Sequence, residues 1–384
     1  MTHAASAAPL SGVRIIEFAG LGPGPFAGMM LADMGAEVIR IDRAGAGSPP
    51  QDFLARGRKS IVLDLKKPDA KDVALRLLST ADALIEGFRP GVMERLGLGP
   101  EAVHAVNPKL VYGRMTGWGQ DGPLAHAAGH DLNYIALSGA LWASGEAGRV
   151  PSFPMNLLGD FGGGGMYLAF GIVTALFNAQ RTGRGDVIDA AICDGTTSLM
   201  AMIYSMRALG QWGDERAANL LDGGAPWYGV YECADGRWIT IGALEPKFWD
   251  LLLDKLGIDA AGFGKRSNRA DWPAMRETFT RIFLSQPRDH WTALLEGTDV
   301  CFAPVLSPSE AHAHPHNAAR RVFAPDGPDQ PMPAPRFRDA ATPLPRPMPA
   351  AGADTRAILL AAGMTGDEID ALIASGTVGA DAGN

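Results

Sequence analysis

The stretch VRIIEFAGLGPGPFAGMMLADMGAEVIRID, residues 13–42, decides the fold. Both ends are apolar and rich in β-branched residues, and between them a glycine-rich turn leads into an apolar, helix-like run. This order predicts a strand, a turn, a helix and a second strand. Such a βαβ unit is the building block of a parallel sheet.

Further strand-like segments follow this unit at short intervals. They read KSIVLDL (59–65), ALIEGF (83–88) and KLVYGRM (109–115), and helix-like segments separate them. The alternation predicts a doubly wound parallel α/β sheet, which is a Rossmann-like fold. Ligands of such sheets bind at the carboxyl ends of the strands.

A different pattern begins after residue 222. The segment APWYGVYECADGRWITIGAL predicts a hairpin that turns at Asp235-Gly236, and helices are expected near 246–256, 273–284 and 287–296. This is a smaller α+β domain. Two long apolar helices, starting near residue 163 and near residue 190, precede it, and two short helices, near 353–361 and 366–375, close the chain.

Composition narrows the class of protein. The chain has 384 residues, 47% hydrophobic residues and a formal net charge of −8. The negative charge disfavours a general affinity for nucleic acid or anionic membranes. Apolar runs such as MYLAFGIVTALF are expected to be too short to span a bilayer. Three widely spaced cysteines and an N-terminus without signal-peptide character favour a cytoplasmic protein, and the histidines at 312, 314 and 316 are assigned no metal.

The glycine-rich turn after the first predicted strand has two possible interpretations. Residues 22–27, GPGPFA, fit the G-x-G-x-x-A fingerprint of dinucleotide-binding folds, and Asp42 ends the next strand about 20 residues on. Two prolines in the turn oppose this reading, because each removes a backbone N–H that would face a pyrophosphate. A glycine-tightened βα turn is the better interpretation.

Arginines gather where the first strands should end. Arg43, Arg58, Arg89 and Arg95 all fall near the predicted strand ends. Guanidinium groups match phosphate oxygens, so a shared site for a multiply phosphorylated ligand is one interpretation, and scattered solvated charge is the other.

Three further residues are candidates for acid/base chemistry. His130 stands where an apolar helix begins, and the helix dipole there favours the neutral imidazole, which can accept a proton. Asp160 precedes four glycines and a long helix; four glycines predict close approach of a ligand to the backbone. Glu245, in Leu244-Glu245-Pro246, is in a position typical of a helix cap. Each of the three also has a purely structural interpretation.

Several segments together resemble the class III CoA-transferase superfamily, in particular its α-methylacyl-CoA racemase branch. They are residues 9–43, LIEGFRPGVMERLGLGP (84–100), RMTGWGQDGPLAHAAGHDLNY (114–134), NLLGDFGGGG (156–165), DGGAPWYGVYECADGRW (222–238) and GALEPKFW (242–249). The similarity runs from about Pro9 to the C-terminal helices.

The resemblance implies an architecture. It implies an interlocked homodimer whose large domain is built from both chain ends, with each active site between the large domain of one subunit and the small domain of the other. We therefore expect a CoA-binding large domain in 1–190, a linker helix in 191–222, a small domain in 223–310, and a return segment in 311–384 that completes the large domain.

The resemblance also implies a reaction, the inversion of the α-carbon of 2-methyl-branched acyl-CoA thioesters in lipid metabolism. No cofactor is implied, since coenzyme A is part of the substrate. By position in the motifs, His130 and Asp160 match the two acid/base residues and Glu245 the acid that partners the histidine. Arg43 and Arg95 match residues that hold CoA phosphates. The transferase branch instead uses the aspartate that matches Asp160 as a nucleophile and usually carries G-[FY]-D where this chain has Gly129-His130-Asp131.

An α-proton next to a thioester is a weak acid, so its removal needs a base and stabilisation of the enolate oxygen. Inversion needs one group on each face. Asp131, Asn156 and Gly162 are the candidates for positioning the substrate and its enolate oxygen, the first through its backbone N–H. Met200, Met202 and Met206 could form an adaptable apolar surface for the acyl chain, or ordinary packing.

Overall fold

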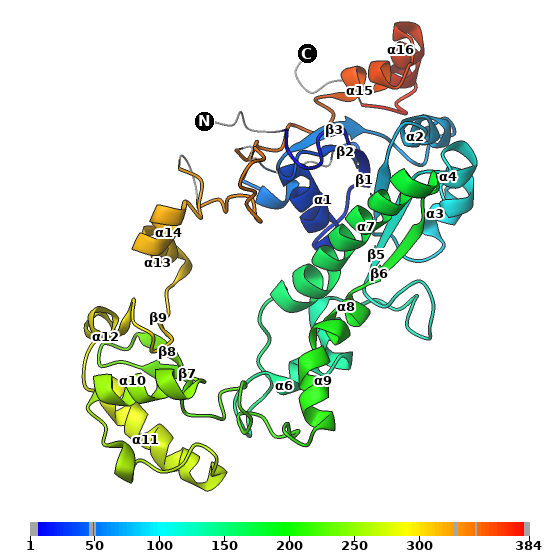
Figure 1. Cartoon of the computed structure of the whole chain (residues 1–384). Coiled ribbons are helices and arrows are strands. Elements are labelled where there is room, and N and C mark those ends of the chain that lie inside the picture. Colours follow the sequence, from blue (N-terminus) through cyan, green and yellow to red (C-terminus); the bar gives the residue numbers. More distant parts are fainter. Residues whose placement is uncertain (1–6, 46–48, 50, 326–328, 342–343, 380–384) are drawn as a thin grey trace. The chain divides into compact units, whose positions relative to one another are not determined.

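The structure is a computed structural model of the chain, and it describes residues 7–45, 49, 51–325, 329–341 and 344–379. The chain divides into two compact units (Figure 1). Unit 1 contains residues 1–138, 154–199 and 321–384, and unit 2 contains residues 139–153 and 200–320. Both chain ends therefore belong to unit 1. Compared with the boundaries expected from the sequence, residues 139–153, 200–222 and 311–320 group with the smaller unit, and residues 191–199 group with the larger one.

Unit 1 is built on a six-stranded sheet with the order β3-β2-β1-β4-β5-β6. Every neighbouring pair is parallel, as in the register Ile15↔Val38 between β1 and β2. This is the strand order of the Rossmann fold, so the predicted fold class is confirmed. The strands are β1 (Arg14–Phe18), β2 (Glu37–Asp42), β3 (Arg58–Val62), β4 (Ala83–Glu86), β5 (Val111–Thr116) and β6 (Val187–Ala191).

Alternate residues of each strand supply the two faces of this sheet. Ile16 and Ile39 point into one apolar cluster, while Ile15 and Val38 point into the other. The first cluster is covered by α2 (Ala70–Leu78), α3 (Val92–Arg95), α4 (Pro100–Val106) and the C-terminal helices α15 (Thr355–Ala361) and α16 (Gly366–Ala374). The second is covered by α1 (Pro23–Asp33) and α7 (Met166–Thr182). The C-terminal segment thus completes the core that the first strands begin.

Three further helices carry the residues of interest. They are α5 (Asp131–Leu137), the π-helix η2 (Leu157–Gly165) and α8 (Ile192–Leu199). The helix η2 runs directly into α7, so the two form one helical stretch from Leu157 to Thr182, of 26 residues and mean hydropathy 1.3. By length and composition this stretch could cross a membrane, so the expectation that all apolar runs are too short is wrong. Core helices of soluble proteins can be equally long and apolar but are mostly buried. Here α7 packs on β5, β6 and α1, and 33% of the most apolar part of the stretch is buried.

Unit 2 contains an antiparallel sheet of order β7-β8-β9. The strands β7 (Tyr228–Glu232) and β8 (Trp238–Gly242) form the predicted hairpin, and β9 (Phe302–Pro304) pairs with β8. Helices α10 (Pro246–Leu256), α11 (Trp272–Phe283) and α12 (Arg288–Leu295) match the predicted segments within one residue at each end. The remaining helices are α6 (Ala140–Ala143), α9 (Ala201–Ala208), α13 (Pro308–Ala313) and α14 (Pro315–Arg320).

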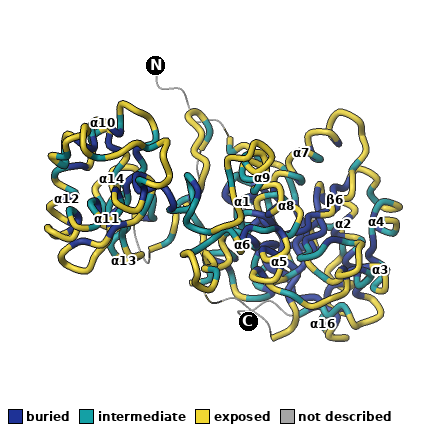
Figure 2. Tube along the Cα trace, turned by 90° about the horizontal axis from the view of Figure 1, so that it is seen from below, coloured by how far each residue is buried: buried dark blue, intermediate teal, exposed yellow. Residues whose placement is uncertain are grey.

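The core of unit 2 is rich in aromatic residues. Trp227 meets Trp249 and Trp272 edge to face, with ring centroids 5.5 and 5.3 Å apart. The Arg266 guanidinium lies over two of these rings, at 5.3 and 5.2 Å from their centroids. In contrast, α9 buries none of its residues within this chain (Figure 2). The helix predicted as long and buried is therefore split into α8 and an exposed α9.

Candidate active site

A cleft of about 480 Å³ opens at the carboxyl ends of the central strands of unit 1. Phe18 of β1, Gly87 after β4 and Thr116 of β5 line it, as expected for a parallel α/β sheet. His130 and Asp160 line the same cleft, although they are far apart in the sequence. The structure thus brings two of the three predicted acid/base residues together.

His130 is the N-cap residue of α5 and is exposed. Its backbone N–H donates to Asn133 Oδ1 at 3.0 Å, and its carbonyl accepts from the N–H of Asn133 at 2.8 Å. One helical turn on, the Tyr134 hydroxyl donates to the carbonyl of Gly129. The peptide just before the imidazole is therefore fixed by side chains of the helix that His130 starts.

Asp160 is half-buried in the first part of η2. Burial raises the pKa of its carboxyl, and the negative charge of Asp131 adds to this effect. A hydrogen bond from Asn156 Nδ2 to Oδ2, at 3.4 Å, and the nearby His130 act in the opposite direction. The sequence left open whether burial or the helix start controls this carboxyl; burial does, and it favours the protonated form.

The glycines after Asp160 allow close packing of η2. A Cβ atom on Gly163 would lie 2.3 Å from Thr196 Oγ1, and one on Gly165 would lie 2.8 Å from the carbonyl of Pro23. The run therefore lets η2 approach α8 and α1, which is a packing role that the sequence analysis did not assign to these glycines; close approach of a ligand stays a prediction. Gly162 is not among the residues that line the cleft. Its predicted contact with substrate finds no support.

One glycine of the first turn, which the sequence analysis interpreted only as part of a tight βα turn, does approach the carboxylate. Gly22, with φ 67°, is the N-cap residue of α1, and a Cβ atom there would lie 3.1 Å from Asp160 Oδ2. A positive φ and the close carboxylate both favour glycine at this position. Trp118 and Tyr134, whose rings meet edge to face with centroids 4.7 Å apart, also line the cleft and were missed. The position of Tyr134, four residues after His130, was the available signal.

The predicted arginine cluster divides into two groups. Arg43 directly after β2, Arg89 shortly after β4 and Arg95 at the end of α3 are exposed, and Arg89 lines the cleft. Arg58 is buried and donates to Glu17 Oε2 at 3.0 Å and to two backbone carbonyls, those of Pro25 and Arg56. The prediction that Arg58 binds CoA is wrong, because its guanidinium is occupied by an internal ion pair.

The structure agrees with the preference for a glycine-tightened turn over a dinucleotide site. Asp42 would have to offer its carboxylate to a ribose, but its side chain is fully buried and accepts a hydrogen bond from Ser60 Oγ at 2.7 Å. Pro23 and Pro25 occupy the first turn of α1, where backbone N–H groups would meet the pyrophosphate.

Glu245 and the three methionines belong to unit 2. Glu245 is the exposed N-cap residue of α10, and Met202 is 57% exposed on α9. Met200 lines a cavity of about 250 Å³ in unit 2, together with Trp142, Tyr204 and Trp212.

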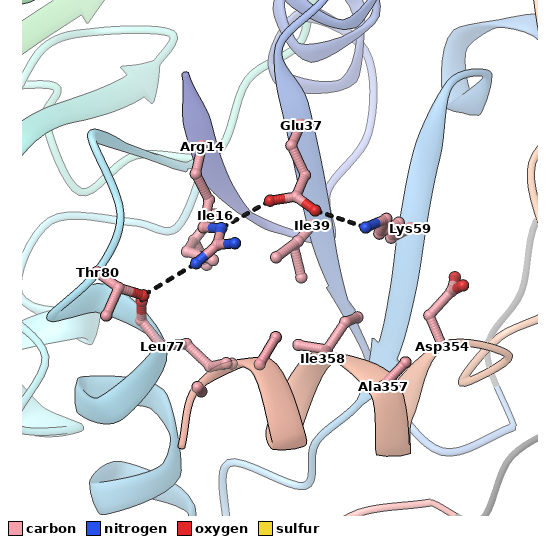
Figure 3. A pocket seen from close by; sticks show the side chains of 12 residues that line it. Arg14, Ile16, Glu37, Ile39, Lys59, Leu77, Thr80, Asp354, Ala357 and Ile358 are labelled. Carbon is pink, nitrogen blue, oxygen red and sulfur yellow. Dashed lines mark hydrogen bonds and ion pairs between the residues drawn. The ribbon is translucent and has the colours of Figure 1, made fainter. Parts of the chain in front are cut away.

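Another cavity of unit 1, of about 100 Å³, lies at the amino ends of β1, β2 and β3, against α15 (Figure 3). Glu37 accepts hydrogen bonds from Arg14 Nε at 2.7 Å and from Lys59 Nζ at 2.5 Å. The charged groups that line this cavity are therefore largely paired with one another. The cleft with His130 and Asp160 is the candidate active site. Within the part of the chain that the structure describes, no three His, Cys, Asp or Glu side chains form a group that could hold a metal ion.

The family model named CoA-transferase family III matches residues 10–355, and the chain belongs to this family. It is 45% identical to alpha-methylacyl-CoA racemase of Mus musculus, over 94% of this chain and 95% of the relative. It is 42% identical to alpha-methylacyl-CoA racemase of Homo sapiens over the same shares. The succinyl-CoA–D-citramalate CoA-transferase of Chloroflexus aurantiacus is 31% identical, with 82% of each chain covered.

Two of the solved structures of similar fold are bacterial proteins. A CaiB/BaiF family protein from Brucella suis matches with a TM-score of 0.81 and 26% identity, over 93% of this chain and 100% of that one. Rv3272 from Mycobacterium tuberculosis matches with a TM-score of 0.76 and 28% identity, over 92% and 99% of the two chains.

Proposed function

We propose that this protein is an isomerase that racemises 2-methyl-branched acyl-CoA thioesters by moving a proton between the two faces of the α-carbon. The observation that carries the proposal is the pairing of His130 with a half-buried Asp160 in one cleft at the carboxyl ends of the strands. The 42–45% identity to two alpha-methylacyl-CoA racemases supports it.

The two groups suit the two half-reactions. For one epimer, neutral His130 takes the α-proton and protonated Asp160 delivers a proton to the opposite face; for the other epimer the roles reverse. Asp160 must then be a carboxylic acid in one direction. Its raised pKa, caused mainly by burial, increases the share of that form.

The charge that develops on the thioester oxygen needs donors. The backbone N–H of Asp131, directly after His130 at the start of α5, is our candidate. Asn156 lies within hydrogen-bond distance of Asp160, so its role is to orient the acid. The reaction as proposed uses no cofactor, because both proton-transfer groups are side chains.

Binding of the substrate is assigned to the exposed arginines and the methionines. Arg43, Arg89 and Arg95 would meet the phosphates of CoA, and Met200, Met202 and Met206 the acyl chain. We also propose an interlocked homodimer, in which Glu245 of the partner subunit orients His130 and stabilises its imidazolium. A cytoplasmic location, with neither nucleic acid nor membrane as a partner, completes the proposal.

The alternative is CoA transfer with Asp160 as nucleophile, an activity found in this family. Two assays separate the activities. A pure (2R)- or (2S)-2-methylacyl-CoA should yield both epimers on incubation with the protein, as measured by chiral chromatography. If instead the thioester and a free carboxylic acid exchange CoA, and hydroxylamine traps an intermediate at Asp160, the protein is a transferase.

A further inference from the structure

The side chain of Asp131 connects the two acid/base residues. Asp131 is the first residue of α5, directly after His130, and is 8% exposed. Its Oδ1 atom accepts the backbone N–H of Asp160 at 2.7 Å. The two segments that carry the catalytic groups therefore meet through one carboxylate.

This hydrogen bond compensates for the geometry of η2. The first N–H groups of any helix have no partner inside the helix. In η2 the hydrogen bond from Phe161 N to the Asn156 carbonyl, at 3.3 Å, spans five residues, and the N–H of Asp160 leaves the helix to meet Asp131. Asp131 thus caps η2 from another element, at the residue whose position the reaction depends on.

The packing around this carboxylate leaves little room for another arrangement. A Cβ atom on Gly159 would lie 2.3 Å from Asp131 Oδ1 and 2.8 Å from Ile135 Cγ2. Gly159 is buried, so the glycine allows η2 to press directly on α5 at Asp131. The contact is specific, since it requires the short Asp131 side chain on α5 and the absence of a side chain at Gly159 on η2.

We propose that Asp131 is a positioning residue that fixes the separation of His130 and Asp160 through this hydrogen bond. The inference rests on the proposed racemase function. A proton that leaves one face and returns on the other needs both groups at fixed places, and a displacement of about 1 Å can cost about 100-fold in rate. The predicted role of Asp131, through its backbone N–H, did not include its side chain.

The charge of Asp131 has a second consequence. It raises the pKa of Asp160, in addition to the larger effect of burial. The other titratable groups close to Asp160 are His130, which lowers that pKa, and Tyr134, whose own pKa is raised by burial and by Asp160; Arg89 and Cys193 also act on Tyr134. Removal of the Asp131 charge therefore moves the deprotonation of Asp160 to lower pH.

Two substitutions at one position separate geometry from charge. Asp131→Asn keeps an oxygen acceptor and removes the charge, while Asp131→Ala removes both. We expect Asp131→Ala to lower kcat for racemisation by about 100-fold with little change in KM. Asp131→Asn should restore most of kcat and move the acid limb of the kcat/KM profile to lower pH. Gly159→Ala, which displaces the same contact without altering the carboxylate, should resemble Asp131→Ala.

A direct measurement of Asp160 keeps this test independent of turnover. Carbodiimide coupling of an amine requires a protonated carboxyl, so the yield at Asp160 against pH, measured by peptide mass spectrometry, reports its protonation. The profile should move to lower pH in Asp131→Asn. If the wild-type protein racemises no branched thioester, the proposed function fails, while this profile still tests the link. Unchanged kcat in Asp131→Ala, or an unchanged Asp160 profile in Asp131→Asn, would overturn the proposal.

Discussion

At the scale of single residues, His130 and Asp160 have distinct chemical roles that substitution can separate. Each group is the base for one epimer only, so the loss of one group leaves the other able to remove and return a proton on its own face. Exchange with solvent and inversion then become separate events. This separation distinguishes two independent bases from a general loss of structure.

His130→Ala should lower the rate of inversion by about 100- to 10,000-fold. The variant should still exchange the α-hydrogen of one epimer with solvent, with retention of configuration. Asp160→Asn should do the same for the other epimer. Inversion and hydrogen exchange are both measured by mass spectrometry and NMR on each pure epimer incubated in D₂O. Exchange of the same epimer by both variants would contradict the assignment of one base to each face.

Substitution of Arg58 tests whether this residue stabilises the fold through its ion pair with Glu17 and does not bind CoA. Its pair with Glu17 is fully buried, with side-chain exposures of 0% and 1%. Arg58→Ala leaves the Glu17 carboxylate without its partner, and should cost about 3–5 kcal/mol in the free energy of unfolding, measured with urea. The exposed Arg43 is the matched control: Arg43→Ala should raise KM for the acyl-CoA and leave stability nearly unchanged. Equal loss of stability in both variants would be incompatible with this division.

The sequence predicts which residues belong to the candidate site, but it does not predict all of their contacts. His130, Asp160 and Arg89 were singled out, and the structure brings them to one cleft. Arg58 looked equivalent to Arg43, because one sequence gives the residue type near a strand end and does not show whether a carboxylate of another strand, here β1 across β2, faces it. Glu17 lies one residue before the end of β1, and its pairing with β3 depends on the whole sheet.

At the scale of elements, η2 is the feature that positions Asp160. The sequence predicts a helix that starts only near residue 163, so it places Asp160 before the helix, whereas η2 begins at Leu157. Periodicity also cannot distinguish a π-helix from an α-helix over nine residues. The glycine run was visible, but its cause was not, since the neighbours that require it, Thr196 of α8 and Pro23 of α1, come from distant segments. By contrast, strands β1 to β5, the hairpin β7–β8 and helices α10 to α12 were predictable because their periodicity is local, whereas the short β9 was not predicted.

Gly163→Ala tests the packing of η2. Its Cβ atom would lie 2.3 Å from Thr196 Oγ1 and 2.7 Å from the backbone nitrogen of Thr196, so we expect a loss of about 1–3 kcal/mol in stability and a fall in kcat as Asp160 moves. Gly366→Ala in α16 is the control, because nothing lies within 4 Å of the added atom. Thermal and urea unfolding compare the two variants. Equal stability of both would show that η2 tolerates a side chain at this position.

At the scale of the whole molecule, the residues assigned to the proposed reaction are divided between the two units of the chain. His130 and Asp160 belong to unit 1, whereas Glu245 and the methionines belong to unit 2. The chain between His130 and Asp160 passes through unit 2 as residues 139–153. The exposed apolar residues of α7, Phe170 and Phe177, at 71% and 62% exposure, are consistent with the proposed dimer.

Mixed dimers test the proposed sharing of the site between subunits. His130→Ala and Glu245→Ala should each be nearly inactive alone. When the two variants are co-expressed and purified through separate tags, the hybrid dimer should regain racemase activity, because one of its two sites then has both residues intact. A hybrid as inactive as its parents would place Glu245 and His130 of one site in the same subunit.

The central claim, inversion by two bases on opposite faces, is tested most directly by the first turnovers in D₂O. One pure epimer of a 2-methylacyl-CoA is incubated with the wild-type protein, and both epimers are separated and analysed for α-deuterium at low conversion. We predict deuterium in the product epimer and mostly hydrogen in the recovered substrate epimer. Equal early deuterium in both epimers, or none in either, would contradict the account.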